Sequence, residues 1–592
     1  MVPVSTAPTT ASTRTSNPAP HRTSKTSKSR KAANGAMQHR HSIPLDMDDI
    51  VADFDTPIED ACLAAKASVI VRTGYLDLSA GTGSYRVKEI MNRLGYALGV
   101  YVRADVNLTS IEASCSDGTD RVTEVVDLPT VGVNTERIWQ MEHFADWLTV
   151  NLGHEGVYHT DAASEVFEYA AEESDDDADS ANFGFDERSL KNFAHEPVSA
   201  QKRAQFLSKM GSSAKNSVDS SSQFKISVSS AEQDRIGFER NAQNDPALQT
   251  QTQTPTQNTA ARPRITVRQA HEKLDAIEKR PRLYGPWMQA LGSAVACACF
   301  VFLLGGAAYD MIGAFVGAGV GQFVRSHMNA KRLNQFLGVA IGVIVAALVT
   351  IATLRMIGYV DPHALGHDTA YIGAILFIVP GFPLITGGLD LAKLDLPSGI
   401  QRIVYFLCVV GVGTLAAWVV ATMVGLSPNG FEAPVLPVWL DITFIFLTAI
   451  GGVWGFSVLF NSPWQMALVA GGIGAIADTT RLVMVNYFSM SLELAAFLGA
   501  LIAGLLASAW RISVRHGYLP AKWGFPRISL TVPSIVIMVP GLYMYRAVYE
   551  LGNLQTVNAM DWIFRAMLVI VGLPIGLAFA RILTDKNWRY DV

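Results

Sequence analysis

The sequence predicts a polytopic α-helical membrane protein, in which ten transmembrane helices form a 5+5 inverted repeat and a small cytoplasmic α/β domain precedes them. Two observations support this fold class. The chain of 592 residues is polar and charged up to about residue 280 and is dominated by long apolar runs from residue 287 onward. Two of these runs carry the same interruption, Val379-Pro380-Gly381 and Val539-Pro540-Gly541, 160 residues apart.

Residues 1–43 and 152–262 are predicted to be disordered. Residues 1–40 contain seven Lys or Arg and no acid, which indicates a basic tail that contacts anionic lipid or keeps the chain soluble. An organelle transit peptide is a third interpretation of this tail. The acidic and polar insertion at 152–262 holds eleven acids between positions 161 and 187, and its composition cannot bury enough apolar surface to fold alone.

Residues 44–151 are predicted to form the cytoplasmic α/β domain. Apolar residues at helical spacing predict a helix over 57–72, and Ser84 is placed to cap a second helix. Strands are expected at 99–104, 106–115 and 121–128, and a hairpin turn over 116–119 joins the last two. Asn134 is expected to cap the helix that ends the domain.

Residues 263–285 are predicted to be a linker helix that Thr266 and Gln269 open with a capping box. Two five-helix membrane repeats follow at 286–425 and 437–583, and a short C-terminal tail covers 584–592. The ten predicted membrane segments are 286–305, 309–325, 335–357, 370–389, 399–425, 437–460, 464–486, 491–511, 527–549 and 560–583.

The charges in the connections predict the orientation of these segments. If the N-terminus is cytoplasmic, the inner connections hold most of the Lys and Arg residues, whereas the outer loops at 306–309 and 426–436 have none. Arg481 and Arg546, near outer ends, are exceptions. The balance predicts a multi-pass protein of the cell membrane with both termini in the cytoplasm. Five segments in each half is an odd number, so consecutive halves must have opposite topology.

The two interruptions are the predicted site of substrate binding and translocation. In lipid, such a break survives only where protein or a water-filled cavity satisfies the freed backbone groups. Exposed carbonyls, amides and helix ends at the break can hold an ammonium and a carboxylate together, which suits an amino acid. The alternative is a pair of simple proline kinks. The two breaks should face one another near the bilayer midplane, and the residues predicted to act there are Pro380, Gly381, Pro383, Pro540 and Gly541.

Three acids are candidates for proton coupling or gating. Asp390 follows the first break, Glu550 is its counterpart 160 residues later, and inverted topology would place them at opposite membrane faces. Ordinary interfacial acids that end a helix are an equally good interpretation of both. Asp478 lies inside an apolar helix, where an ionisable residue is rare and often functional, although an ion pair with Arg481 would also explain it.

The sequence contains no constellation typical of an enzyme. The five cysteines form no C-x-x-C pair, and the Gly81–Ser84 segment lacks the lysine of a phosphate-binding P-loop. A nucleophilic role for Ser84 has no identifiable histidine partner. We therefore expect no catalytic residue, no metal, no cofactor and no nucleic-acid partner.

The order of these elements resembles the bacterial threonine/serine exporter family, which combines a soluble N-terminal domain with ten membrane segments and has relatives in fungi. The resemblance covers about 57–151 and 263–583, so the acidic insertion and both tails lie outside it. The residues that carry it are Gly81-Thr82-Gly83-Ser84, Glu89, Met91, Leu98-Gly99 and Val131-Gly132-Val133-Asn134 in the soluble part, and Pro380-Gly381-x-Pro383, Asp390, Asp395, Ser398-Gly399, Arg402, Pro540-Gly541 and Tyr545 in the membrane part.

The resemblance implies export of threonine and serine from the cytoplasm, driven by the proton gradient and without covalent chemistry. The sequence is thus interpreted as a secondary active antiporter that works by alternating access. Its partners would be threonine or serine, protons and membrane lipid, and a homo-oligomer is compatible with this interpretation. The alternatives are a channel for amino acids or small solutes, and a membrane-anchored regulatory or enzymatic protein that acts through its N-terminal domain.

Overall fold

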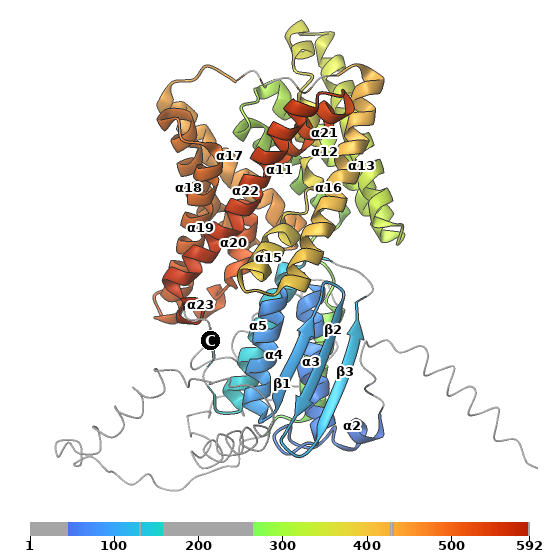
Figure 1. The fold of residues 1–592 in the computed structure, drawn as a ribbon, viewed down its shortest axis with the longest axis vertical. Helices are drawn as coiled ribbons and strands as arrows, with labels where there is room; N and C mark the ends of the chain where they lie inside the picture. Colours follow the sequence, from blue (N-terminus) through green and yellow to red (C-terminus); the bar gives the residue numbers. More distant parts are fainter. Residues whose placement is uncertain are drawn as a thin grey trace, which may run out of the picture.

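The structure, a computed structural model, describes residue 45 and residues 47–128, 132–154, 156–157, 264–426, 428, 431 and 433–589. Figure 1 shows an α/β domain at one end of the long axis and a bundle of helices at the other. The tail predicted over 1–43 and nearly all of the insertion predicted over 152–262 lie outside the described residues.

The α/β domain is built on an antiparallel sheet with the strand order β1-β2-β3. The strands are β1 (Tyr101–Val106), β2 (Ser110–Ser116) and β3 (Arg121–Asp127), and the helices are α2 (Asp48–Ala52), α3 (Leu63–Ser79), α4 (Ser84–Leu98), α5 (Thr135–Asn151) and α10 (Val267–Lys279). Successive side chains of a strand point to opposite faces, and the buried ones, such as Val106, Ile111 and Cys115, join the apolar core with the helices.

Two helix boundaries in this domain differ from the sequence prediction. The first long helix begins at Leu63 instead of residue 57, because Pro57 forms an antiparallel bridge with Thr266 and its neighbourhood is therefore extended. The N-cap residue of α4 is Gly83 and not Ser84. The hydroxyl of Ser84 is not used as a cap because it bonds to the membrane part of the chain.

Three other local predictions are confirmed. The turn at 116–119 joins β2 to β3 in an antiparallel hairpin. The side chain of Asn134 accepts a hydrogen bond from the Arg137 N–H and so caps α5. Thr266 and Gln269 form a reciprocal capping box at the start of α10, with hydrogen bonds of 3.1 and 3.3 Å.

The bundle consists of helices that follow one another through short connections. In chain order its elements are α11 (Pro286–Leu303), α12 (Ala308–Ala330), α13 (Gln335–Gly358), η2 (Pro362–Gly366), α14 (Ala370–Ala374), η3 (Leu376–Ile378), α15 (Gly381–Ala392), α16 (Leu396–Val424), α17 (Val438–Leu459), α18 (Trp464–Phe488), α19 (Leu492–Arg515), η4 (Ala521–Trp523), α20 (Arg527–Val536), α21 (Gly541–Gly552), α22 (Thr556–Thr584) and α23 (Lys586–Arg589).

The described residues make the chain a multi-pass membrane protein. Seven helices are long and apolar enough to cross a membrane, and the number rises to nine if each of two bent helix pairs counts as one span. The predicted segment 309–325 is helical, as part of α12, but it does not meet the same criterion of length and hydropathy. Glycine contributes little hydropathy, and α12 is rich in it. The count of ten spans therefore stays a prediction.

The N-terminal end of α5 fixes the α/β domain to the connection between α17 and α18. Thr135 donates its N–H to the Phe460 carbonyl at 3.0 Å, and its hydroxyl lies 2.7 Å from that of Ser462. The Asn461 side chain donates to the Glu136 carboxylate at 3.1 Å. The domain thus contacts both halves of the bundle, because its residues 82–84 form hydrogen bonds with α15 and α16 in the first half.

Candidate functional site

Both interruptions are unwound turns with nearly the same backbone. At the first break, residues 379–381, Pro380 has φ −81° and ψ 68°; at the second break, residues 539–541, Pro540 has φ −80° and ψ 54°. In each break the glycine N–H donates to the carbonyl two residues earlier, at 2.8 Å. The helices on the two sides are bent by 60° at the first break and by 48° at the second.

The two breaks pack directly against each other. A Cβ atom added to either glycine would meet side chains of the other break: Gly381 would meet Val536 and Val539, and Gly541 would meet Leu376 and Val379. Positions 376 and 379 correspond to 536 and 539 after a shift of 160 residues. The same two positions of each break therefore contact the glycine of the other break. A self-complementary contact of this kind is typical of a two-fold axis.

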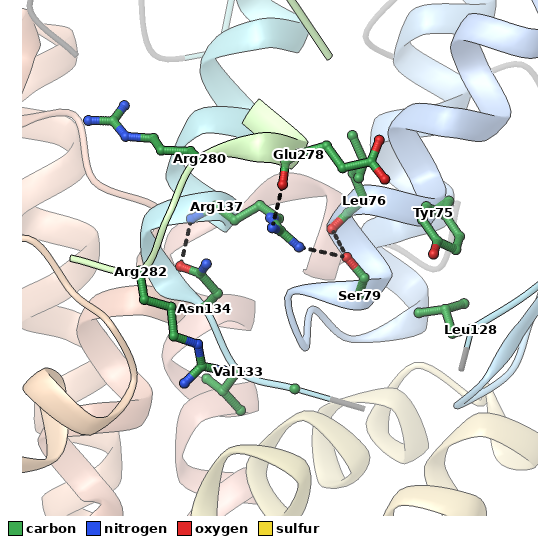
Figure 2. A pocket seen from close by; sticks show the side chains of 11 residues that line it. Tyr75, Leu76, Ser79, Leu128, Val133, Asn134, Arg137, Glu278, Arg280 and Arg282 are labelled. Atoms are coloured by element: carbon green, nitrogen blue, oxygen red, sulfur yellow. Dashed lines mark hydrogen bonds between the residues drawn. The ribbon is translucent and has the colours of Figure 1, made fainter. Parts of the chain in front are cut away.

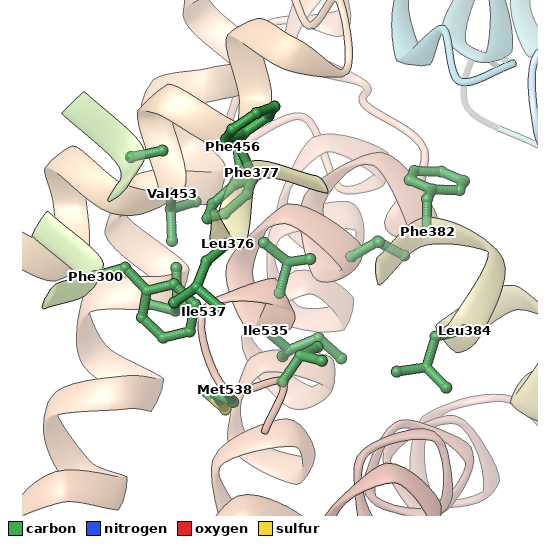
Figure 3. Close-up of a cluster of buried hydrophobic side chains, with 14 of the residues drawn as sticks. Phe300, Leu376, Phe377, Phe382, Leu384, Val453, Phe456, Ile535, Ile537 and Met538 are labelled. Atoms are coloured by element: carbon green, nitrogen blue, oxygen red, sulfur yellow. The ribbon is translucent and has the colours of Figure 1, made fainter. Parts of the chain in front are cut away.

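The surroundings of the breaks are apolar. Figure 3 shows side chains from both breaks in one cluster, among them Leu376 and Phe377 beside the first and Ile537 and Met538 beside the second. Pro383 is also buried, in the first turn of α15, where a missing N–H costs no helical hydrogen bond. Polar contacts at this place would therefore come mainly from the unwound backbone.

A hydrogen bond between two buried tyrosines joins the two bent helix pairs. The hydroxyl oxygens of Tyr371 in α14 and Tyr545 in α21 lie 2.8 Å apart, and both side chains are fully buried. Their rings meet edge to face. Each hydroxyl satisfies the other in a place that water does not reach, so this pair holds α14 and α21 in one relative position.

Asp390 is fully buried at the far end of α15, where the α/β domain meets the bundle. Its carboxylate pairs with the Arg402 guanidinium at 3.1 Å and accepts a hydrogen bond from the Ser398 hydroxyl at 3.3 Å. It also accepts the backbone N–H groups of Ser84 at 3.3 Å and Tyr85 at 3.4 Å. These two N–H groups open α4, and the N-terminus of a helix favours an anion.

The segment 81–84, which we call the docking loop, completes this contact. Arg402 donates to the Thr82 carbonyl at 2.7 Å, and the Ser84 hydroxyl donates to Asp395 at 2.6 Å. Gly83 needs to be glycine here, because a Cβ would lie 2.9 Å from an Asp390 oxygen. The docking loop therefore joins the α/β domain to the ends of α15 and α16 through buried polar groups.

Asp77 supports the docking loop from within the α/β domain. Its carboxylate accepts a hydrogen bond from the Thr82 hydroxyl at 2.7 Å and is buried. Burial raises the pKa of Asp77 to about 6, although the Thr82 hydrogen bond and the positive charges of Arg86, Arg93 and Arg402 act in the opposite direction. The loop thus rests on a carboxyl group that titrates near neutral pH.

Glu550 has no comparable surroundings. It lies half-buried near the end of α21, which points away from the α/β domain in Figure 1. Its backbone carbonyl accepts the Gln555 N–H at 2.8 Å, as that of Asp390 accepts the Asp395 N–H at 2.9 Å. The two acids therefore occupy matching backbone positions at opposite ends of the bundle, and only Asp390 is covered.

Asp478 is fully buried within α18 and pairs with Arg481 on the same helix. The Arg481 Nε lies 2.6 Å from one carboxylate oxygen of Asp478. The other oxygen, Oδ2, is buried and has no hydrogen-bond partner among the described residues. An unsatisfied buried carboxylate oxygen is costly, and the ion pair with Arg481, which the sequence offered as the alternative interpretation of Asp478, is present.

The structure brings together residues that the sequence left separate. Reasoning from spacing did not connect the docking loop with Asp395 or Arg402, because they are more than 300 residues apart and no local pattern joins them. One sequence signal was available. The same residues carry the family resemblance in both the soluble and the membrane part.

A cavity of about 260 Å³ lies inside the α/β domain, beside the start of α5 (Figure 2). Arg137 lies at its centre and donates to the Ser79 hydroxyl at 3.3 Å and to the Glu278 carbonyl at 3.2 Å. Arg280 and Arg282 line it from the linker that follows α10. The cavity is remote from both breaks, so we assign it no part in translocation. Within the described parts of the chain, no group of His, Cys, Asp or Glu could hold a metal ion.

Two family models match the chain. The model described as "Putative threonine/serine exporter" matches residues 68–155 and 248–424, and the model described as "Threonine/Serine exporter, ThrE" matches residues 442–583. Together they cover most of the α/β domain, the linker helix and most of the bundle. Their boundary falls between α16 and α17, where the sequence predicts that one repeat ends and the next begins.

Curated relatives are similar to parts of the chain. A "Probable succinate transporter subunit" of Klebsiella aerogenes is 26% identical over 23% of this chain and 55% of its own length. A "Probable threonine/serine exporter" of Mycobacterium tuberculosis is 23% identical over 54% of this chain and 59% of its own. A "Pheromone-regulated membrane protein 10" of Eremothecium gossypii is 24% identical over 50% of this chain and 38% of its own. The chain thus spans roughly half the length of these relatives. No solved structure matches it.

Proposed function

Because the chain belongs to the threonine/serine exporter family, a family of transporters and not of enzymes, we propose that it exports threonine- and serine-like amino acids by proton antiport. The observation that carries this proposal is the reciprocal contact between the two breaks. Paired interrupted helices at matching places in two halves are the usual substrate site of secondary transporters.

Ten spans in a 5+5 inverted repeat are part of the proposal. Helices that follow the breaks correspond closely: α15 and α21 both have 12 residues, and α16 and α22 both have 29. Leu394 and Leu554, again 160 residues apart, share a positive φ of 60° in the turns between them. These matches, and the opposite directions of α15 and α21 in Figure 1, support a two-fold relation between the halves.

The orientation in the cell membrane is also proposed, with both termini in the cytoplasm. The α/β domain and the C-terminal helix α23 lie on the same side of the bundle, where the rings of Tyr85 and Trp588 are 5.5 Å apart. The connections on that side carry most of the Lys and Arg residues, in agreement with the positive-inside rule.

Substrate would bind between the breaks, at Pro380, Gly381, Pro383, Pro540 and Gly541. The carbonyls of Val379 and Val539 each accept one N–H and have a second lone pair, which would accept a hydrogen bond from the substrate ammonium. The N-termini of α15 and α21 would attract its carboxylate. Since the side chains nearby are apolar, small hydroxy amino acids would be favoured over charged ones.

Of the three candidate acids, Asp478 is best suited to carry the proton. Its free buried oxygen can take up a proton without breaking the bond to Arg481. Asp390 is fully bonded at the domain junction, which suits a gate that opens when the docking loop leaves. Glu550, half-buried at the opposite end, would be the corresponding gate residue of the second repeat.

The test uses the full chain in proteoliposomes loaded with labelled threonine, with and without an imposed pH gradient. We expect saturable efflux that the gradient accelerates, and Asp478→Asn should remove the acceleration while exchange of threonine for threonine continues. Asp441→Asn, which changes an acid in the first turn of α17, is the control and should keep the coupling. Efflux without saturation would indicate a channel, and transport of succinate in place of threonine and serine would overturn the substrate assignment.

A further inference from the structure

A second cavity lies at the junction between the α/β domain and the bundle. It has a volume of about 440 Å³ and is bounded by α4 on one side and by the ends of α15, α19, α20 and α22 on the other. Figure 1 shows these elements meeting between the domain and the bundle, next to α23. It is a different place from the breaks, which lie within the apolar core.

The lining of this junction cavity is strongly basic. Six cationic side chains, Arg86, Lys88, Lys393, Arg511, Arg527 and Arg581, face three acids, Glu89, Asp395 and Asp585. Some of the charge is neutralised by ion pairs, such as that of Lys88 with Asp395 at 2.7 Å and that of Arg527 with Asp585 at 3.5 Å. Arg86 is also paired, with Glu142 outside the lining, so the six cations face four acids in all, and the remaining positive charge would attract an anion.

Arg581 is the residue in this cavity whose charge is least compensated. Its side chain is only 7% exposed, and no described residue forms a hydrogen bond or an ion pair with it. The guanidinium is instead held by two aromatic rings, at 5.3 Å from the centre of Tyr85 and 4.9 Å from that of Trp588. Such contacts orient the guanidinium and leave its N–H groups available to a ligand.

Tyr85 provides a second unused group in the same cavity. Its hydroxyl is buried and has no hydrogen-bond partner within the described ranges. Burial raises the pKa of Tyr85, so the hydroxyl keeps its proton and can donate it in a hydrogen bond. The positive-inside rule accounts for basic residues at exposed helix ends, but it does not account for a buried arginine and a buried tyrosine hydroxyl that share one cavity.

We propose that the junction cavity binds a phosphate group, which contacts the α/β domain through Tyr85 and the bundle through Arg581. A phosphate offers several strong acceptor oxygens to guanidinium and hydroxyl donors, and its charge matches the surplus in the lining. Since α19 and α22 are long and apolar enough to cross a membrane, their ends would lie near its surface, so the phosphate could come from an anionic phospholipid or from a soluble phosphate.

The experiment measures binding by the full chain in a neutral maltoside detergent, in two arms. One arm is titrated with short-chain phosphatidylglycerol and the other with inorganic phosphate, at constant ionic strength. Saturable binding in the lipid arm alone identifies a lipid headgroup, and binding in the phosphate arm identifies a soluble anion. The experiment measures anion binding and not transport. Its result therefore does not depend on which substrate the chain transports.

Three variants link binding to the cavity. Arg581→Gln should weaken binding about tenfold, which is the usual effect of losing a charge-assisted hydrogen bond. Tyr85→Phe keeps the ring over Arg581 and removes only the hydroxyl, so it should weaken binding about threefold with an unchanged melting temperature. Arg515→Gln removes an exposed arginine one turn from Arg511 and outside the cavity, and it should bind like the wild type.

Two results would overturn the proposal. One is the absence of saturable binding of either probe. The other is an equal loss of binding in Arg515→Gln and Arg581→Gln, since it would show that general surface charge and not the cavity attracts the anion.

Discussion

The two broken helices have nearly the same backbone but very different surroundings. At their breaks, the residues around Gly381 and Gly541 make matching contacts with each other. At their far ends the match is lost, because Asp390 is buried beneath the docking loop whereas Glu550 is half-buried at the opposite end of the bundle. The comparison teaches that the two breaks are alike at the centre of the bundle and that the α/β domain makes its two ends unequal.

This inequality has a mechanical consequence for transport. A motion of α15 would have to carry the docking loop with it or break its contacts with Asp390, Asp395 and Arg402. A motion of α21 meets no such contact at Glu550. Under the proposed alternating access, exchange between the two access states should therefore depend on the α/β domain at one end only.

The largest effect is expected from neutralising the two matching acids. Asp390→Asn should destabilise the full chain by about 3–5 kcal/mol, because it leaves Arg402 charged and buried without its carboxylate. Glu550→Gln should change stability by less than about 0.5 kcal/mol, as is usual for a partly exposed side chain. Thermal unfolding in one detergent measures both, and equal effects of the two substitutions would refute the asymmetry.

Hydrogen exchange provides a local readout for the same pair of variants. The amides of Ser84 and Tyr85 donate to Asp390, so they should lose protection in Asp390→Asn and keep it in Glu550→Gln. If protection were unchanged in Asp390→Asn, the docking loop would be held by its other contacts alone.

A smaller and symmetrical effect is expected at the breaks. Gly381→Ala and Gly541→Ala each place a methyl group against the other break and should each cost about 1–3 kcal/mol, as overpacking of a close contact does. Gly472→Ala is the control, because nothing lies within 4 Å of a Cβ at that position. Unfolding temperatures and threonine efflux check this prediction. A large cost at one break only would show that the two contacts are not equivalent.

The last effect depends on pH and concerns the first broken helix alone. The pKa of Asp77 is raised from 3.8 to about 6 in the folded chain, so the folded state favours the protonated carboxyl and loses stability as the pH rises from about 4 to above 6. Asp77→Asn keeps an acceptor for the Thr82 hydroxyl and removes the charge. Relative to the wild type, the variant should gain about 3 kcal/mol at pH 8 and less than about 1 kcal/mol at pH 4.

Unfolding midpoints measured across this pH range test the prediction. Glu112→Gln serves as a control, since this exposed residue of β2 pairs with Asp105 and Val125 and lies outside the docking loop. A stability difference for Asp77→Asn that did not depend on pH would mean that the substitution acts through packing and not through the charge.

Much of the local structure could be predicted because it depends on neighbouring residues. The Asn134 cap, the capping box of Thr266 and Gln269 and the turn at 116–119 each need only a few consecutive residues. The long apolar helices and the two breaks follow in the same way from composition and from the backbone chemistry of proline and glycine. The start of the first long helix was missed because Pro57 pairs with Thr266, which is more than 200 residues away.

The sequence by itself determined that this chain is a multi-pass membrane protein with two matching interrupted helices, since hydropathy and backbone stereochemistry act locally. Only the tertiary structure decided what surrounds those helices. Asp390 and Glu550 occupy matching places in the sequence, yet one is buried against Arg402 and the docking loop and the other is not. The environment of a charge is set by residues distant in the chain, and no local pattern records which of them will come close.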